Sequence, residues 1–150
     1  MRKSVFILIA LAFLPVTWAQ ADAKEEAASL VRVFMDAYNR HDAKTLISAC
    51  AREASILYDV PPYHWSGRDT CTRWLKDVRN EEHRIDIANT VATLEKIRHV
   101  MVSGTHAYVT VDLHFSFRWH GKEGEEQDVA LFTLSRSGDR WLVSGMSLAL

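Results

Sequence analysis

The sequence lacks the short motifs that mark metal, phosphate and nucleophile sites. Its seven histidines are scattered without an H-x-x-x-H or H-E-x-x-H spacing, and its two cysteines are too far apart in sequence to form a short metal-binding hairpin. It also has no glycine-rich phosphate loop and no G-x-S-x-G turn. We therefore expect no metal ion and no cofactor.

An excess of positive charge is absent as well. The chain has 18 lysine and arginine residues against 19 acidic ones, and two of the basic residues, Arg2 and Lys3, lie in an N-terminal segment that we expect to be removed. The rest of the sequence has no basic stripe or cluster of the kind that neutralises the phosphates of nucleic acids. The sequence therefore predicts no nucleic-acid partner.

A third absence is a hydrophobic run long enough to cross a membrane. The apolar run from Val5 to Leu14 is shorter than the roughly 20 residues of a spanning helix, and Pro15 interrupts it. Ala19-Gln20-Ala21 has the small-x-small pattern of a cleavage site. We interpret residues 1–21 as a secretory signal peptide and not as an uncleaved anchor. Residues 22–150 should then form one periplasmic or secreted domain that has left the membrane.

The two cysteines, Cys50 and Cys71, would both be present in that oxidising compartment. Cys50 continues the apolar stripe of a second helix and Cys71 begins that of a third, so both thiols are expected to face inward. They either form a disulfide that closes a loop of about 20 residues, stabilising the fold by roughly 3 kcal/mol, or pack as two small buried apolar groups. Both alternatives stay open, because spacing alone does not fix the Cα separation.

Hydrophobic periodicity predicts three helices in the first half of the chain. In residues 25–40 apolar side chains recur at helical spacing with charged residues elsewhere, which is typical of an amphipathic helix. A short helix is expected over residues 43–50, with Asp42 as its N-cap. The third is expected over residues 66–80, because Ser66-Gly67-Arg68-Asp69 resembles a capping box.

After residue 80 the apolar pattern changes to a period of two, which is typical of strands. Strands are expected over residues 54–58, 84–102 with an interruption near Glu95, 106–119, 127–136 and 140–148. The turns His120-Gly121-Lys122 and Ser137-Gly138-Asp139 would join the last three strands as hairpins. This order predicts an α+β fold in which three N-terminal helices cover one face of a mostly antiparallel sheet.

Four short segments occur in a moderately specific order and spacing. They are Phe34-Met35-Asp36-Ala37-Tyr38-Asn39-Arg40-His41-Asp42, Ala54-Ser55-Ile56-Leu57, Trp65-Ser66-Gly67-Arg68 and Gly138-Asp139-Arg140-Trp141-Leu142-Val143. In these segments, and in the order of elements, the chain resembles the nuclear-transport-factor-2-like superfamily and, within it, the SnoaL-like, ketosteroid-isomerase-like branch. The resemblance implies a strongly bent sheet wrapped against the helices around a cone-shaped apolar pocket, usually in a homodimer.

The same resemblance argues against one activity. In ketosteroid isomerases a first-helix tyrosine and a later-strand aspartic acid form the oxyanion hole, and the corresponding positions here hold Phe34 and Ala130. Neither side chain can donate a hydrogen bond to a developing enolate. Asp59, with Tyr58 as its competitor, stands near the position of the proton-shuttling base. Ketosteroid isomerisation is therefore not expected.

The candidate catalytic residues follow the first strand, at a corner that forms the pocket rim in this fold. The residues of this corner are Tyr58, Asp59, Tyr63, His64 and Trp65. If the protein is an enzyme, the expected general base is Asp59 or His64, with a pKa tuned by burial. The alternative is structural, because Asp59-Val60-Pro61-Pro62 is also a turn and Trp65 also suits the bottom of the core.

The ligand-binding residues are expected to be mostly aromatic. Apolar walls would come from Tyr38, Trp74, Phe117, Trp119 and Phe132, with Tyr58 and Trp65 at the rim, unless these side chains are only core. Asp128 shares the inward parity of Ala130 and Phe132. There an unpaired carboxylate would be costly unless it met a ligand or a partner, whereas a frayed strand start would leave it in water.

The strand expected over residues 106–119 has an apolar face and a polar face. The polar face holds Tyr108, Thr110, Asp112 and His114 and should point away from the helices. Asp112 and His114 are therefore interpreted as a dimer contact or a solvated surface, and not as a catalytic pair.

Three hypotheses for function follow. The first is an exported SnoaL-like domain that binds a small apolar molecule in its internal pocket. The second is an isomerase, cyclase or dehydratase that uses no cofactor. The third is a dimeric protein-interaction module that uses the open sheet face.

Overall fold

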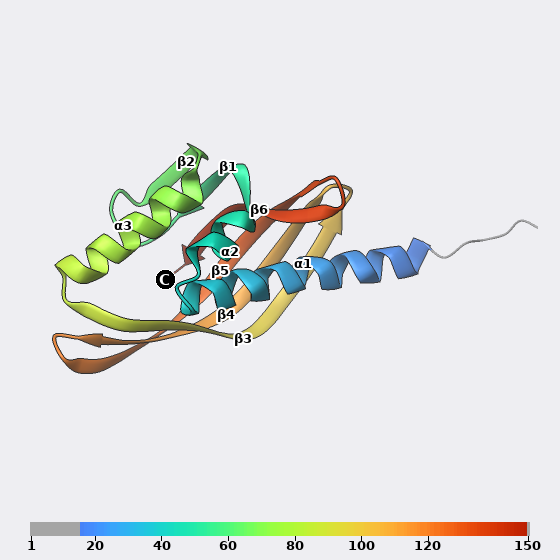
Figure 1. Ribbon diagram of the computed structural model, residues 1–150. Helices are drawn as coiled ribbons and strands as arrows, with labels where there is room; N and C mark the ends of the chain where they lie inside the picture. The colour runs from blue at the N-terminus through green and yellow to red at the C-terminus, as the bar shows by residue number, and fades with distance from the viewer. Residues whose placement is uncertain (1–15, 150) are drawn as a thin grey trace, which may run out of the picture.

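The computed structural model describes residues 16–149, which form three helices and six strands (Figure 1). Residues 1–15, most of the predicted signal peptide, lie outside the described residues. The predicted α+β fold is confirmed, since the helices α1, α2 and α3 pack against one mixed sheet. Within the described range no helix is both long enough and apolar enough to cross a membrane.

The first helix, α1, spans Val16–Asn39 and so begins before the predicted start at residue 25. It runs through Ala19-Gln20-Ala21, the predicted cleavage site. Its buried face is built at helical spacing by fully enclosed side chains such as Ala27, Val31 and Phe34. At its C-terminus the side chain of Asn39 fixes the helix on the sheet.

Asn39 joins α1 to the middle of strand β3 (Ile87–Ser103). Its side-chain amide donates to the Ala92 carbonyl at 2.9 Å, and its carbonyl accepts from the Ala92 backbone N–H at 2.8 Å. These two bonds satisfy the backbone N–H and carbonyl of Ala92, which α1 would otherwise cover without hydrogen-bond partners. They hold the end of α1 over the sheet.

The second helix, α2, spans Ala43–Ser48, and Asp42 is its N-cap, as predicted, with Oδ1 accepting from the Thr45 N–H at 3.0 Å. The expectation that this helix continues to Cys50 is wrong, because Cys50 is the first residue of strand β1 (Cys50–Leu57). The chain leaves the helix at Ala49, whose carbonyl accepts from the Val143 N–H and so begins the sheet.

The third helix, α3, spans Thr70–Arg84 and not residues 66–80. The predicted capping box is wrong because Ser66 belongs to strand β2 (His64–Arg68), which pairs with β1. Asp69 occupies the N-cap position in the left-handed conformation, with φ of 56°, and its side chain makes no cap hydrogen bond. α3 buries Cys71, Trp74, Leu75 and Val78, which lie at the spacing that places them on one face.

The sheet has the strand order β2-β1-β6-β5-β4-β3. The strands β3, β4 (His106–Trp119), β5 (Lys122–Ser137) and β6 (Arg140–Ala149) form the predicted antiparallel meander. Only the pairing of β1 with β6 is parallel. Figure 1 shows the long meander strands bending around α1, while α3 lies beside β1 and β2 at one end of the sheet.

A disulfide links the start of β1 to the first turn of α3. Cys50 and Cys71 are bonded, with their Cα atoms 6.5 Å apart. The structure therefore selects the first of the two alternatives that the spacing left open. The bond fixes the end of α3 that carries Trp74, one turn further on, over the sheet.

The core lies between the helices and the inner face of the sheet. Along β4, Val109, Val111, Leu113 and Phe115 are buried, and the residues between them are not. The same alternation on β5 places Asp128, Ala130 and Phe132 inside. An aspartate therefore lies on the face that packs against the helices.

Candidate functional site

The inner cavity lies where α1, α3, β1, β4 and β6 meet, and its lining is apolar and aromatic. The lining residues are Phe34, Met35, Tyr38, Tyr58, Trp74, Leu113, Phe115, Met146 and Leu148. The cavity has a free volume of only about 10 Å³, because side chains fill most of the space between helices and sheet. Tyr38 and Trp74, two of the predicted wall residues, lie here together with Tyr58, which was predicted at the rim.

Trp74 is the centre of an aromatic cluster in this cavity. Its ring centroid lies 5.5 Å from that of Tyr58, 5.9 Å from that of Tyr38 and 6.1 Å from that of Phe34. The indole Nε1 of Trp74 is buried and has no hydrogen-bond partner in the structure. Such a donor is uncommon in a core, and a ligand atom that accepts a hydrogen bond would satisfy it.

A second, larger cavity adjoins the inner one and shares Tyr58 and Phe115 with it. Its volume is about 180 Å³. Apolar side chains from α3, β3 and β4 line its walls, among them Val78, Ile87 and Phe117. The two cavities together form the candidate site, with the larger one as its outer chamber.

The position of Phe117 in the outer chamber depends on Gly124, the residue opposite it. Phe117 pairs with Gly124 across β4 and β5. A Cβ atom at Gly124 would lie 2.5 Å from the Phe117 ring, so only glycine leaves this ring its space. The glycine therefore sets the shape of the chamber wall.

Four carboxylates are among the residues that line the outer chamber. We call Asp59, Glu82 and Glu126, which come from the β1–β2 connection, α3 and β5, the acidic rim. Glu81 also lines the chamber, but it forms an ion pair with Arg84. Burial raises the pKa of the Asp59 carboxyl above its ordinary value, which makes Asp59 a better proton acceptor than an exposed aspartate.

Asp128 lies on the inner face of β5, opposite Leu113 of the inner cavity, and lines neither chamber itself. Its residue surface is only 6% exposed, and its Oδ1 atom makes no hydrogen bond. Burial, and then the negative charges of Glu126 and Asp59, raise its pKa from an ordinary 3.8 to about 6. The predicted inward direction of Asp128 is therefore what the structure shows.

Two tyrosine hydroxyls meet in the inner cavity. Burial is the main reason that the pKa values of Tyr38 and Tyr58 are raised, and an interaction between the two hydroxyls adds to the effect on Tyr58. Both phenols therefore stay protonated at neutral pH and can donate hydrogen bonds. Phe34 and Ala130 are fully buried and offer no donor.

The remaining corner residues are not gathered at the cavities. His64 is exposed on β2, where its Nε2 lies 3.1 Å from the Ser55 hydroxyl, and Tyr63 is 59% exposed. Trp65 is buried, and its indole donates to Asp77 Oδ2 at 2.8 Å. Neither His64 nor Trp65 lines either chamber, so Asp59 is the one of the two predicted bases that does.

Two further predicted wall residues differ in position. Phe132 is fully buried and packs edge-on against Phe34, with ring centroids 5.7 Å apart. Trp119 is 54% exposed at the end of β4, beyond the helices, and its indole donates to the Ile85 carbonyl at 3.1 Å. It therefore lies outside both chambers, although it shares strand parity with Phe117.

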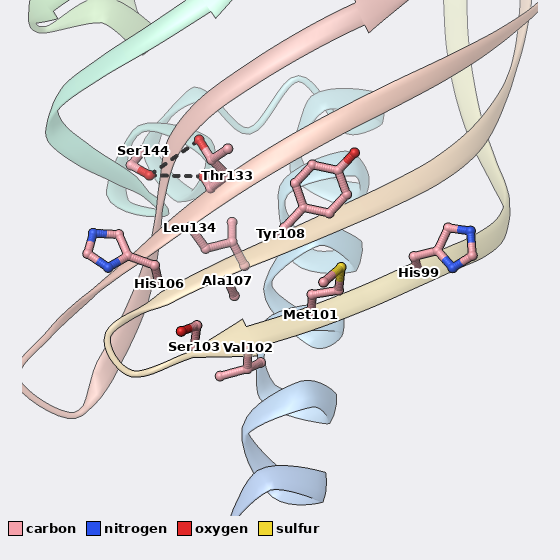
Figure 2. A pocket seen from close by; sticks show the side chains of 10 residues that line it. All are labelled: His99, Met101, Val102, Ser103, His106, Ala107, Tyr108, Thr133, Leu134 and Ser144. Carbon is pink, nitrogen blue, oxygen red and sulfur yellow. Dashed lines mark hydrogen bonds between the residues drawn. The ribbon is translucent and has the colours of Figure 1, made fainter.

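The outer face of the sheet carries a separate, broad groove of about 850 Å³. Figure 2 shows Tyr108, Met101 and His99 standing on this groove, with Thr133 and Ser144 joined by hydrogen bonds at one side. Met101 is 65% exposed and Tyr108 40% exposed, so the groove presents apolar surface to solvent.

On that outer face Asp112 and His114 take part in contacts with charged surface residues. Asp112 pairs with Arg98, and the two ring nitrogens of His114 lie 4.0 Å from Glu95 and 3.7 Å from Glu125. They do not contact the chambers, as predicted from strand parity. Among the described residues no group of three or more histidine, cysteine or acidic side chains is arranged to hold a metal ion.

Two members of the acidic rim, Glu82 and Glu126, are the part of the site that sequence reasoning missed. Glu126 precedes the predicted strand start at residue 127, and Glu82 follows the predicted helix end at residue 80. The available signal was parity, since Glu126 lies two residues before Asp128 on the same face.

Comparison with known proteins agrees with this architecture. Residues 27–147 match the model of the SnoaL-like domain family. No curated protein matches the sequence significantly.

Several solved structures share the fold at low sequence identity. An NTF2-like protein with a cystatin-like fold from Novosphingobium aromaticivorans is 15% identical over 89% of this chain and 84% of that chain, with a TM-score of 0.71. A scytalone dehydratase-like protein from the same organism is 15% identical over 89% and 87% of the two chains, also with a TM-score of 0.71. The association domain of C. elegans CaMKII is 15% identical over 88% and 98%, with a TM-score of 0.67. At these identities the likeness establishes the fold alone.

Proposed function

The chain belongs to the SnoaL-like domain family, and on this premise we propose that it binds a small molecule with an apolar body in the outer chamber. The observation that carries the proposal is a chamber of about 180 Å³ whose lining includes the aromatic rings of Tyr58, Phe115 and Phe117 and several aliphatic side chains. An apolar cavity of about 150 Å³ is enough to bind benzene. The chamber therefore suits a ligand with a single aromatic ring or an aliphatic body of similar size.

We further propose that this binding takes place outside the cytoplasm. The signal peptide predicted from residues 1–21 supports export, and so does the bond between Cys50 and Cys71, because structural disulfides persist mainly in oxidising compartments. Expression with the native leader, followed by fractionation and N-terminal sequencing, tests this proposal. Retention in the cytoplasm with residues 1–21 intact would contradict it.

The first test of binding is native mass spectrometry of residues 22–150 purified gently from a periplasmic expression. Extra mass that is released on denaturation would show a bound molecule and give its class. The second test is calorimetric titration with 2-phenylethanol, a neutral single-ring probe that fits the chamber without using charge.

A matched pair of variants locates the binding. Phe117→Ala removes a wall of the outer chamber, whereas Trp119→Ala removes a larger aromatic ring two residues further along the same strand but outside both chambers. We expect Phe117→Ala to weaken 2-phenylethanol binding roughly tenfold and Trp119→Ala to leave it within about twofold. Equal losses in the two variants would reject the chamber as the binding site.

A second candidate function is proton transfer without a cofactor, as in an isomerase, cyclase or dehydratase. The observation that favours it is the carboxyl of Asp59 at the chamber, with a pKa raised by burial. The Tyr38 and Tyr58 hydroxyls are the nearby donors to a developing oxyanion. Once a substrate is known, Asp59→Asn should abolish turnover with little change in melting temperature, and retained turnover would remove Asp59 as the base.

The groove on the outer sheet face favours a third role, association of two copies of the chain. Its exposed Met101 and Tyr108 would be covered in a dimer that joins the sheets face to face. Tyr108→Glu should then convert the dimer to a monomer in sedimentation experiments. A wild-type chain that stays monomeric at high concentration would reject this role.

A further inference from the structure

Several carboxylates line the outer chamber, and the binding of a neutral apolar molecule does not account for them. The acidic rim brings one carboxylate from each of three separate segments to the lining of the chamber. Asp128 adds a fourth close by, opposite Leu113 of the inner cavity, although it does not itself line the outer chamber. Among residues 16–149, none of these four carboxylates takes part in an ion pair. The negative charge at the chamber is therefore not neutralised by the rest of the described chain.

Asp128 is a buried member of this group of carboxylates. The residue is 6% exposed, its Oδ1 atom has no hydrogen-bond partner, and it lies close enough to Asp59 and Glu126 for their charges to act on it. Burying a carboxylate without a partner is costly, and like charges nearby increase the cost. A cation placed among these groups would reverse the unfavourable interaction.

Arg79 on α3, whose charge acts on the Tyr38 hydroxyl in the inner cavity, forms no ion pair with the acidic rim or with Asp128. Its Nε atom is buried and also lacks a hydrogen-bond partner. No lysine or arginine is among the residues that line the outer chamber, so the described chain places no positive charge there.

The walls of the chamber suit a cation that carries an apolar body. Tyr58, Phe115 and Phe117 line the same space as the acidic rim. Aromatic faces attract ammonium groups, and they also pack against rings and alkyl chains. The lining of the chamber thus combines carboxylates with aromatic surface.

We propose that the ligand of this site is a small organic amine, bound as its ammonium ion. Its charged nitrogen lies among Asp59, Glu126 and Asp128, and its apolar body packs against Phe115 and Phe117. The inference rests on the proposed function, because it names the chemical class of the molecule that the chamber takes. It also excludes small carboxylates of the same size, which the acidic rim repels.

The test compares three probes that share a phenyl ring and differ in the charge of the head group. They are 2-phenylethylamine, 2-phenylethanol and phenylacetate, titrated calorimetrically into residues 22–150 at neutral pH. We expect the amine to bind at least roughly tenfold more tightly than the alcohol, since hydrogen bonds between charged groups are stronger than neutral ones. Phenylacetate should bind more weakly than the alcohol.

Three variants that each remove one carboxylate charge assign the effect to the chamber. Asp128→Asn and Glu126→Gln should each weaken amine binding roughly tenfold and leave alcohol binding within about twofold. Glu125→Gln is the matched control, because Glu125 neighbours Glu126 but lies near His114 on the opposite face of β5. It removes the same charge and should leave the affinity for the amine unchanged.

The outcomes separate the two proposals. If the alcohol binds as tightly as the amine, or phenylacetate binds most tightly, the chamber binds small molecules but the inference of an amine is wrong. If Glu125→Gln weakens amine binding as much as Glu126→Gln, a general charge effect accounts for the preference and the assigned site is wrong. If none of the three probes binds, the proposed function fails and the inference fails with it.

Discussion

Replacing Asp128 with asparagine should stabilise the protein at neutral pH. In the folded state the Asp128 carboxyl is buried on β5, without a partner for Oδ1, and faces the charges of Glu126 from its own strand and Asp59 from the β1–β2 connection. In the unfolded chain the same carboxyl is surrounded by water. Ionisation of Asp128 therefore opposes folding, and asparagine has nearly the same shape without the charge.

The size of the effect follows from the pKa of Asp128, which is raised from 3.8 to about 6 on folding. A raised carboxyl pKa means that the folded state binds the proton more tightly, so stability falls as the pH rises from about 3.8 to 6. Above that range the full cost is present and amounts to at most roughly 3 kcal/mol. Because the buried asparagine amide still needs partners, we expect a net gain of about 1–3 kcal/mol near pH 7.5 and little gain near pH 4.

Thermal and urea unfolding of the wild type, Asp128→Asn and the control Glu125→Gln at both pH values would measure this change in the free energy of unfolding. A gain of that size corresponds to an increase in melting temperature of roughly 3–10 °C for a domain of this length. The reasoning predicts that the gain nearly vanishes in acid, whereas Glu125→Gln stays within about 0.5 kcal/mol of the wild type at both pH values. An Asp128→Asn gain that is equal at the two pH values, or a loss of stability at neutral pH, would refute it.

Other variants test the contacts that shape the site. Replacing both Cys50 and Cys71 with serine should lower the free energy of unfolding by about 3 kcal/mol, because the bond closes a loop of about 20 residues; urea unfolding measures this, and an unchanged midpoint would contradict it. Asn39→Ala should cost about 2 kcal/mol, since it removes the two hydrogen bonds to the backbone of Ala92, and hydrogen exchange at Ala92 should rise while that of distant strands does not. Gly124→Ala should push the Phe117 ring into the outer chamber and weaken 2-phenylethanol binding roughly tenfold by calorimetry; unchanged affinity would mean that the ring does not shape the chamber.

The meander could be predicted from the sequence because its signal is local. Along β4 the apolar residues Val109, Val111, Leu113 and Phe115 alternate without a break, and the predicted strand over residues 106–119 has the bounds that the structure shows. The interruption predicted near Glu95 corresponds to a shift in register between Leu94 and Lys96. Where one face of a strand is buried throughout, period and position are both visible in the sequence.

Elements with few buried residues were not predictable in this way. β2 buries only Trp65 of its five residues, so it has no alternation to detect, and its pairing with β1 is a tertiary interaction. The parallel pairing of β1 with β6 joins two strands that are far apart in the sequence and leaves no local pattern either. The choice between a disulfide and two packed thiols also needed the Cα separation, which the sequence does not contain.

The candidate site was predictable only one residue at a time. Parity placed Asp128 inward correctly, because that depends on position within one strand. Parity also favoured Trp119 as a wall, but the indole lies beyond the helices, and no strand pattern reports where the covering layer ends. The acidic rim combines a loop, a helix and a strand, so its members meet only in the folded chain.

The effects of Asp128→Asn on stability and on ligand binding distinguish a binding site from an unfavourable position in the core. A buried carboxylate that binds no ligand lowers the stability of the fold and contributes nothing to binding. Removing its charge should then raise the melting temperature without weakening ligand binding. A carboxylate that receives a cationic ligand lowers the stability of the free protein and raises the affinity for the ligand, so Asp128→Asn should move the two quantities in opposite directions. Adding 2-phenylethylamine should accordingly raise the melting temperature of the wild type more than that of Asp128→Asn, because only the wild type gains the ion pair. Equal shifts in the two proteins would mean that the buried charge is a cost of the fold and not part of the site.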